Sequence, residues 1–175
     1  MASRHEHRRH ERSQDAGTSD LQIDRARKTG VRVSDEDFTG GPLDVATLEV
    51  VAGRVSTHPL VDGWALRPDA LSPRRLEVHL DVDLYPGAVE STRLDVRWFE
   101  GGDYTVHYLE TWDDQTWQCR WDRHPKPGGP TEHFHPPPDA GQDIEPSELG
   151  ATHHLDVVFT VLEWVSERIE RLHDQ

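Results

Sequence analysis

Hydrophobic residues recur at every second position through the middle of the chain, which is the spacing of strands with one buried face. Short segments rich in Pro, Gly and Asp separate these runs, so consecutive strands are expected to pair as an antiparallel meander. A further short strand is predicted near residues 61–66. The four alternating runs are Leu76 to Leu84, Leu94 to Trp98, Tyr104 to Tyr108 and Trp117 to Trp121.

Two other segments show the three-to-four-residue spacing of amphipathic helices. The first covers about residues 43–57, after Pro42, and the second about residues 153–173, with Thr152 as its expected N-cap. One apolar sheet face and two amphipathic helices predict a two-layer α+β domain. We expect an antiparallel meander of four to five strands, with the long C-terminal helix and the shorter N-terminal helix on one face.

The alternation also predicts which side chains occupy the opposite face of the sheet. That face is either solvated surface or a binding surface. Trp117, Cys119 and Trp121 fall on the apolar face instead, where a thiol is protonated and unreactive. The polar positions are His79, Arg93, Arg97, Thr105, His107, Arg120 and Asp122.

The apolar pattern is weak in two segments, which sets the expected domain boundaries. Residues 1–41 hold too few large apolar side chains to offset the entropy of ordering, so we expect a disordered tail, basic over residues 1–32 with a net charge of +3. Residues 42–175 are expected to form a single α+β domain. Within it, residues 124–150 carry seven prolines and four glycines and predict a long loop of functional or disordered type.

Composition narrows the class of protein. The 175 residues carry a net charge of −14, and no run approaches the roughly 20 apolar residues that span a bilayer. The N-terminus lacks the apolar core of a secretion signal and Cys119 is the sole cysteine, so we expect a cytoplasmic protein with no membrane partner. The acidic, lysine-poor composition resembles that of haloarchaeal-type proteins. In about 1 M salt the net charge is screened, so local contacts would determine what the protein binds.

Residues able to carry chemistry gather at the end of the last predicted strand and in the loop after it. Arg120, Asp122 and His124 stand at alternate positions, and His133 and His135 flank Phe134 further along. If Phe134 points into the core, the two histidines point together to the other side. We take Arg120, Asp122, His124, His133 and His135 as candidate catalytic residues.

This set of residues suits several kinds of chemistry. His133 or His135 can serve as general base, and the other, or His124, as general acid. Arg120 can stabilise the oxyanion that develops on a phosphoryl group, and Asp122 can orient a histidine or that arginine. These roles together would allow RNA cleavage without a metal or other cofactor. The histidines with Asp122 or Glu132 can instead ligate zinc, nickel or copper. Tryptophans and arginines can stack bases and contact phosphate. A purely structural interpretation has the histidines packing the Pro-rich loop and Arg120 pairing with Asp122 across strands.

The order of these residues resembles the C-terminal motif of TumE-type toxins of toxin–antitoxin modules. In that family a strand reading roughly R-[WY]-D-N-x-P-H-H precedes F-P-H-H-x-H, an E-P-S stretch and a helix. The resemblance implies a growth-inhibiting protein that acts on RNA or translation, is neutralised by a helix-turn-helix antitoxin and uses the same five residues. The matching positions are Tyr108, Trp112, Trp117, Arg120-Trp121-Asp122, His124-Pro125, Glu132-His133-Phe134-His135 and Glu145-Pro146-Ser147.

A second function class stays open on the sequence alone. The alternative is a non-enzymatic regulatory or interaction protein that uses the polar sheet face and the long terminal helix, with or without a metal on the same histidines. A stripe beside that helix, including Val157 and Trp164, suits either a homodimer seam or packing against the N-terminal helix.

Overall fold

The structure is a computed structural model that describes residues 41–113, 115–126 and 128–175. The predicted tail, residues 1–41, lies outside the described residues except for Gly41. Among the described residues, neither helix is both long enough and apolar enough to cross a membrane.

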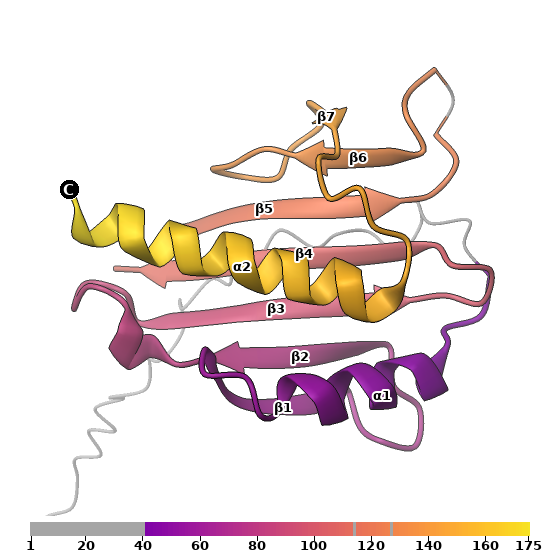
Figure 1. Cartoon of the computed structure of the whole chain (residues 1–175), viewed down its shortest axis with the longest axis horizontal. Coiled ribbons are helices and arrows are strands. Elements are labelled where there is room, and N and C mark those ends of the chain that lie inside the picture. Colours follow the sequence, from indigo (N-terminus) through magenta and orange to yellow (C-terminus); the bar gives the residue numbers. More distant parts are fainter. Residues whose placement is uncertain (1–40, 114, 127) are drawn as a thin grey trace, which may run out of the picture. The chain divides into compact units, whose positions relative to one another are not determined.

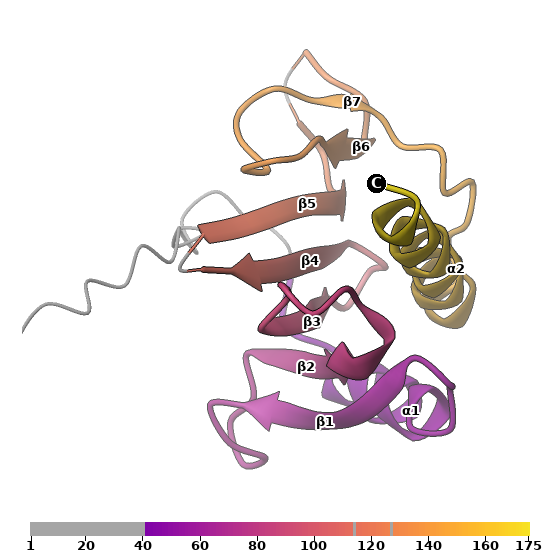
Figure 2. The same ribbon diagram turned by 90° about the vertical axis from the view of Figure 1, so that its left-hand side faces the viewer.

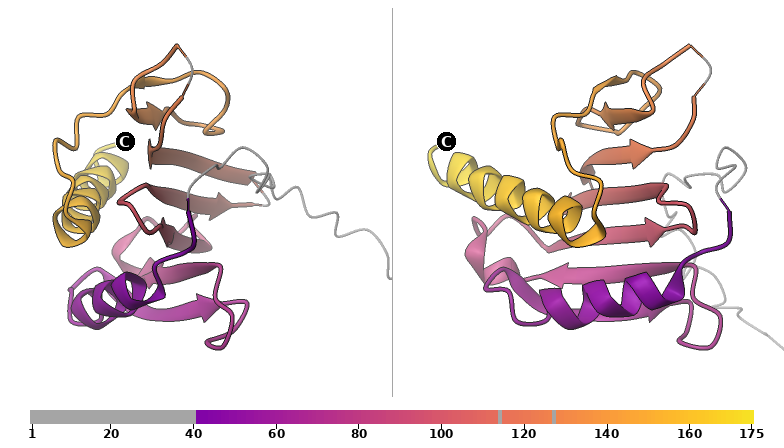
Figure 3. Two further views of the ribbon diagram at one scale, coloured as in Figure 1. Left: turned by 90° about the vertical axis from the view of Figure 1, so that its right-hand side faces the viewer. Right: turned by 45° about the vertical axis from the view of Figure 1, so that its right-hand side comes forward.

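In the part of the chain that the structure describes, seven strands form one antiparallel sheet in which each strand pairs with its neighbours in the chain (Figure 1). Both helices lie on the same face of this sheet (Figures 2 and 3), which confirms the predicted α+β class. The strands are β1 (Val61–Arg67), β2 (Arg75–Leu80), β3 (Ser91–Trp98), β4 (Tyr104–Trp112), β5 (Gln115–Arg123), β6 (Glu132–His135) and β7 (Glu145–Pro146), and the helices are α1 (Val45–Val55) and α2 (His154–His173).

The prediction of four to five strands is too low because β6 and β7 lie inside the segment expected to be a loop. Each is too short to show a run of alternating residues. Pairing with a neighbour gives their backbone groups hydrogen-bond partners, and β6 extends the sheet from β5 while β7 extends it from β6. Tertiary pairing, and not local sequence pattern, therefore makes these residues strands.

The strand predicted from the alternating run Leu76 to Leu84 is also shorter than that run indicates. β2 ends at Leu80, and Val82–Leu84 form a short 3-10 helix instead of further strand. The Asp81 side chain accepts a hydrogen bond from the Asp83 backbone nitrogen at 3.0 Å, which caps this turn. Leu84, expected in the core, is consequently 37% exposed.

The two helices begin differently. α1 begins at Val45 because the carboxylate of Asp44 accepts a hydrogen bond from the Thr47 backbone nitrogen at 2.9 Å. α2 begins at His154, and its N-cap is His153, whose side chain makes no capping bond within the described part of the chain. The predicted cap at Thr152 is therefore wrong by one residue.

The core lies between the sheet and the helices and contains most of the predicted alternating residues. Trp121 packs against Phe134 with ring centroids 5.1 Å apart, which attaches β6 to the core. Val157 is fully buried, and Trp164 stacks on Trp117, so the stripe beside α2 packs within this chain. Buried members from the strands include Leu76, Val78, Leu94, Val96, Tyr104, Val106, Tyr108 and Cys119.

Candidate functional site

Strand register brings four of the five candidate residues together. In the β5–β6 pair, Arg120 lies opposite His135 and Asp122 lies opposite His133. Between them, Phe134 lies opposite Trp121 and contacts its ring. Because side chains alternate along a strand, the four polar side chains share the face away from the helices. The predicted common orientation of the two histidines is therefore confirmed.

The two histidines lie on strand β6, so the expectation that they belong to a loop is wrong. As members of β6 they have a fixed spacing from the side chains of β5, because paired strands hold opposite residues close together. A free loop would not fix that spacing.

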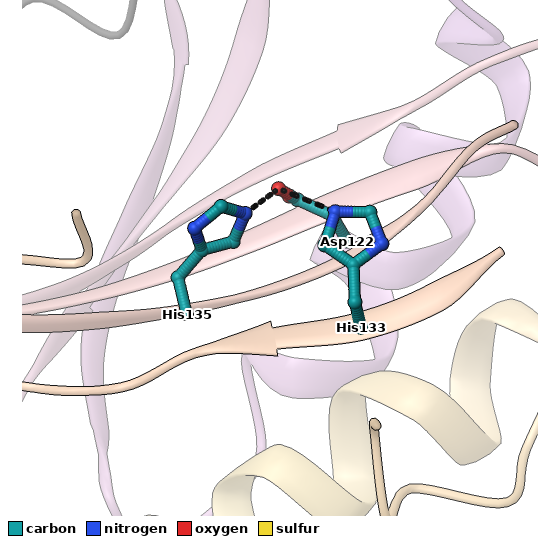
Figure 4. A group of neighbouring side chains, drawn as sticks. All are labelled: Asp122, His133 and His135. Carbon is teal, nitrogen blue, oxygen red and sulfur yellow. Dashed lines mark ion pairs between the residues drawn. The ribbon is translucent and has the colours of Figure 1, made fainter. Parts of the chain in front are cut away.

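Asp122 is the centre of the cluster (Figure 4). Its Oδ2 lies 2.8 Å from Arg120 Nε, 3.1 Å from His135 Nε2 and 3.8 Å from His133 Nε2. Arg120 Nη2 lies 2.9 Å from His135 Nε2, so the guanidinium contacts both partners. The ion pair expected between Arg120 and Asp122 is present, although both residues belong to β5 and the pair does not cross strands.

Backbone carbonyls fix the orientation of both imidazole rings. Nδ1 of His133 lies 3.1 Å from the Pro130 oxygen, and Nδ1 of His135 lies 2.6 Å from the Gly141 oxygen. A carbonyl oxygen only accepts, so each Nδ1 carries the hydrogen and donates it. Both rings therefore direct Nε2 toward Asp122.

The cluster is buried, and burial sets its charge. Exposure is 2% for Asp122, 0% for His133 and 4% for His135. Burial lowers the pKa of His133, and the charge of Asp122 offsets this only in part. Burial raises the pKa of Asp122, but the Arg120 charge beside it and the other polar contacts of the carboxylate outweigh that effect, and the pKa lies below its usual value. A neutral His133 thus faces an ionised carboxylate.

His107 extends the cluster onto β4. It lies opposite Arg120, and its Nε2 hydrogen bonds with the Gln118 side-chain oxygen at 3.0 Å. Burial and the nearby Arg120 charge lower the pKa of His107 to about 4. The alternation predicts His107 on this face, but only the register between β4 and β5 shows that it lies opposite Arg120 and so adjoins the site.

His124 joins the cluster at its edge. Its ring meets that of His133 edge-on, with centroids 4.9 Å apart, and it is less buried than His133. The structure therefore brings all five candidates to one place. Cys119 and Trp121 lie in the core as predicted, and burial raises the pKa of the Cys119 thiol.

The fold and the cluster together define a small α+β protein whose sheet carries a buried His/Asp/Arg site opposite its helices. A family model described as Toxin TumE matches residues 51–169, which is more than half of the chain and includes all five candidate residues. This chain belongs to the TumE toxin family. No curated protein and no solved structure matches the sequence.

Proposed function

We propose that this chain is the toxin of a toxin–antitoxin module, and that it inhibits growth in the cytoplasm by acting on RNA or on translation. Membership of the TumE toxin family supports the toxin class. The observation that supports the site is the meeting of Arg120, Asp122, His124, His133 and His135 at one place on the sheet.

Arg120 is the residue best suited to receive a phosphate. Its side chain is 15% exposed, and contacts with Asp122 and His135 hold it in one orientation. A guanidinium presents several donors in a planar arrangement that matches phosphate oxygens. In a chain of net charge −14, such a local contact has to overcome the repulsion that the acidic surface exerts on RNA.

The candidate residues divide by exposure into two roles. His124, at the edge of the cluster, is placed to transfer a proton to or from a substrate. Asp122, His133 and His135 are too buried to meet RNA directly, so we assign them as positioning residues that hold Arg120. All five residues belong to the proposed site, and the general acid and base role falls to the accessible histidine.

We further propose that a helix-turn-helix antitoxin neutralises this toxin, as the TumE resemblance implies. Coexpression of the antitoxin from the neighbouring gene should then restore growth. The stripe beside α2 that suggested a homodimer packs within one chain and so does not support one. The homodimer stays an untested prediction.

Induced expression tests the proposal directly. Wild type should arrest growth and fragment total RNA, while Arg120→Ala and His124→Ala should do neither. His79→Ala is the matched control, because His79 is a histidine on β2 with 41% side-chain exposure and is not part of the cluster. Growth arrest with intact RNA would indicate that translation, and not RNA, is the target. Normal growth on expression of wild type would contradict the toxin function and favour the interaction protein.

A further inference from the structure

We infer that Asp122, His133 and His135 form a binding site for a divalent transition-metal cation such as Zn²⁺. The inference rests on the site of the proposed function but not on its chemistry. It is carried by the geometry of three donor atoms, one from each side chain, that lie within 4.8 Å of one another (Figure 4).

The spacing of these atoms is close to that of a metal site. Ligands about 2.0 Å from a tetrahedral ion lie about 3.3 Å from one another. The carboxylate of Asp122 lies 3.1 Å from His135 Nε2 and 3.8 Å from His133 Nε2. Small side-chain rotations would therefore bring the three atoms onto one cation, with no movement of the paired strands.

The hydrogen bonds of the two rings match those of metal-binding histidines. Such histidines donate the other ring N–H to a carbonyl or carboxylate, which fixes the tautomer and leaves a lone pair for the metal. His133 does so toward the Pro130 oxygen, and His135 toward the Gly141 oxygen. Each ring then presents Nε2 as an acceptor.

The same hydrogen bonds argue against a purely structural cluster. A packed polar cluster pairs donors with acceptors, and buried polar atoms without a partner are rare. Here Asp122 Oδ1 and His133 Nε2 are buried and have no hydrogen-bond partner among the described residues. The lone pair of His133 Nε2 thus faces the Asp122 carboxylate, whose Oδ2 lies 3.8 Å away, and a cation between the two acceptors would satisfy both.

The donor set indicates the class of cation. Two imidazoles and one carboxylate suit zinc and its neighbours in the first transition row, whereas magnesium and calcium prefer all-oxygen ligands. Three protein ligands also leave a coordination position for a water or a phosphate oxygen. Arg120 lies beside that position, since its side chain contacts Asp122 and His135.

Arg120 provides a sharp test because it competes with the cation. Its Nη2 lies 2.9 Å from His135 Nε2, the atom that the metal requires. Loss of the guanidinium frees this acceptor and removes a repelling charge, so Arg120→Gln should bind Zn²⁺ at least about tenfold more tightly than wild type. A site built only to hold Arg120 predicts no such gain.

The experiment uses the full chain with His5, His7 and His10 replaced by alanine, so that these tail histidines cannot bind metal. Calorimetric titration with Zn²⁺ should give one equivalent bound, and Co²⁺ should give the visible absorption of a low-symmetry site. Asp122→Asn and His133→Gln in this background should each weaken Zn²⁺ binding by at least about 100-fold. His79→Gln, the exposed control, should bind as the parent does.

Two results would overturn the inference: equal Zn²⁺ affinity in the parent and in His133→Gln, or an unchanged affinity in Arg120→Gln. Circular dichroism identifies any variant that fails to fold, in which case the parent and Arg120→Gln decide the question. The readout uses purified protein, so it is independent of toxicity. Zn²⁺ binding without growth arrest would reject the proposed function alone, and growth arrest without Zn²⁺ binding would reject the metal site alone.

Discussion

Arg168 of α2 makes a bidentate ion pair with Glu110 of β4, a residue 58 positions earlier in the chain, at 2.9 and 3.1 Å. Glu110 is fully buried and also accepts hydrogen bonds from the Tyr108 hydroxyl and the Trp112 indole. The Arg168 guanidinium lies 3.9 Å from the centroid of the Trp117 ring. The pair therefore anchors the C-terminal helix to the sheet.

Removal of Arg168 should be strongly destabilising. Arg168→Met leaves the buried Glu110 carboxylate without its counter-charge, so urea unfolding should show a loss of about 3–5 kcal/mol. Arg171→Met, one turn further along α2, removes an exposed pair with Glu167 and a contact of the guanidinium 5.9 Å from the Trp164 ring centroid, and should cost about 1 kcal/mol. Adding Glu110→Gln to Arg168→Met should recover part of the loss. Similar losses for Arg168→Met and Arg171→Met would contradict this account.

His107 should make stability depend on pH. Its pKa is about 4 in the folded chain, against about 6.5 when unfolded, so the unfolded state takes up the proton first as pH falls. The part of the free energy of unfolding that depends on a neutral His107 is fully present above pH 6.5. It is lost between pH 6.5 and 4, by up to about 3 kcal/mol.

A pH series of unfolding measurements checks this prediction. His107→Gln cannot be protonated, so its free energy of unfolding should fall less steeply than that of wild type between pH 6.5 and 4. His173→Gln changes an exposed histidine and should keep the wild-type slope. A His107→Gln slope equal to that of wild type would rule out His107 as the source.

Arg120 should not tolerate replacement by lysine. A lysine keeps the charge but offers a single point of contact in place of the planar group that reaches Asp122 at 2.8 Å and His135 at 2.9 Å. We expect Arg120→Lys to reduce growth inhibition by about 10- to 100-fold, the equivalent of one charge-assisted hydrogen bond. Colony counts after induction measure this effect.

Arg123→Lys is the matched control for that replacement. Arg123 lies on the same strand but lies 3.4 Å from Glu132, away from the buried cluster, with 29% of its side chain exposed. It should inhibit growth as strongly as wild type. Equal losses in the two lysine variants would mean that general stability, and not the geometry of the site, determines toxicity.

The turn between β3 and β4 requires glycine for backbone reasons. Gly101 has a φ of +100°, although a Cβ there would meet no described atom within 4 Å. Gly101→Ala should therefore destabilise by about 1 kcal/mol or more through strain alone. Gly87 has equal space and no positive φ, so Gly87→Ala should be neutral or stabilise by up to about 1 kcal/mol. Thermal unfolding compares the two, and equal effects would contradict the backbone explanation.

The alternating apolar residues by themselves determined the sheet, its buried face and the helix stripes. Leu94 and Val106 lie in the core because burial of every second side chain is a local property of a strand, readable from spacing. The same rule placed Asp122 on the opposite face and gave His133 and His135 a shared direction. The order of these residues was also enough to suggest the family that the chain belongs to.

Tertiary structure alone decided the rest, because it depends on pairing between distant segments. Only the register of β6 against β5 places His135 opposite Arg120 and His133 opposite Asp122, and β6 is too short to be recognised from its own pattern. The burial of His133 and His135 likewise depends on tertiary structure, because the loop carbonyls of Pro130 and Gly141 lie against their rings. The pairing of Arg168 with Glu110 joins a helix to a strand 58 residues away, and no local periodicity encodes such a contact.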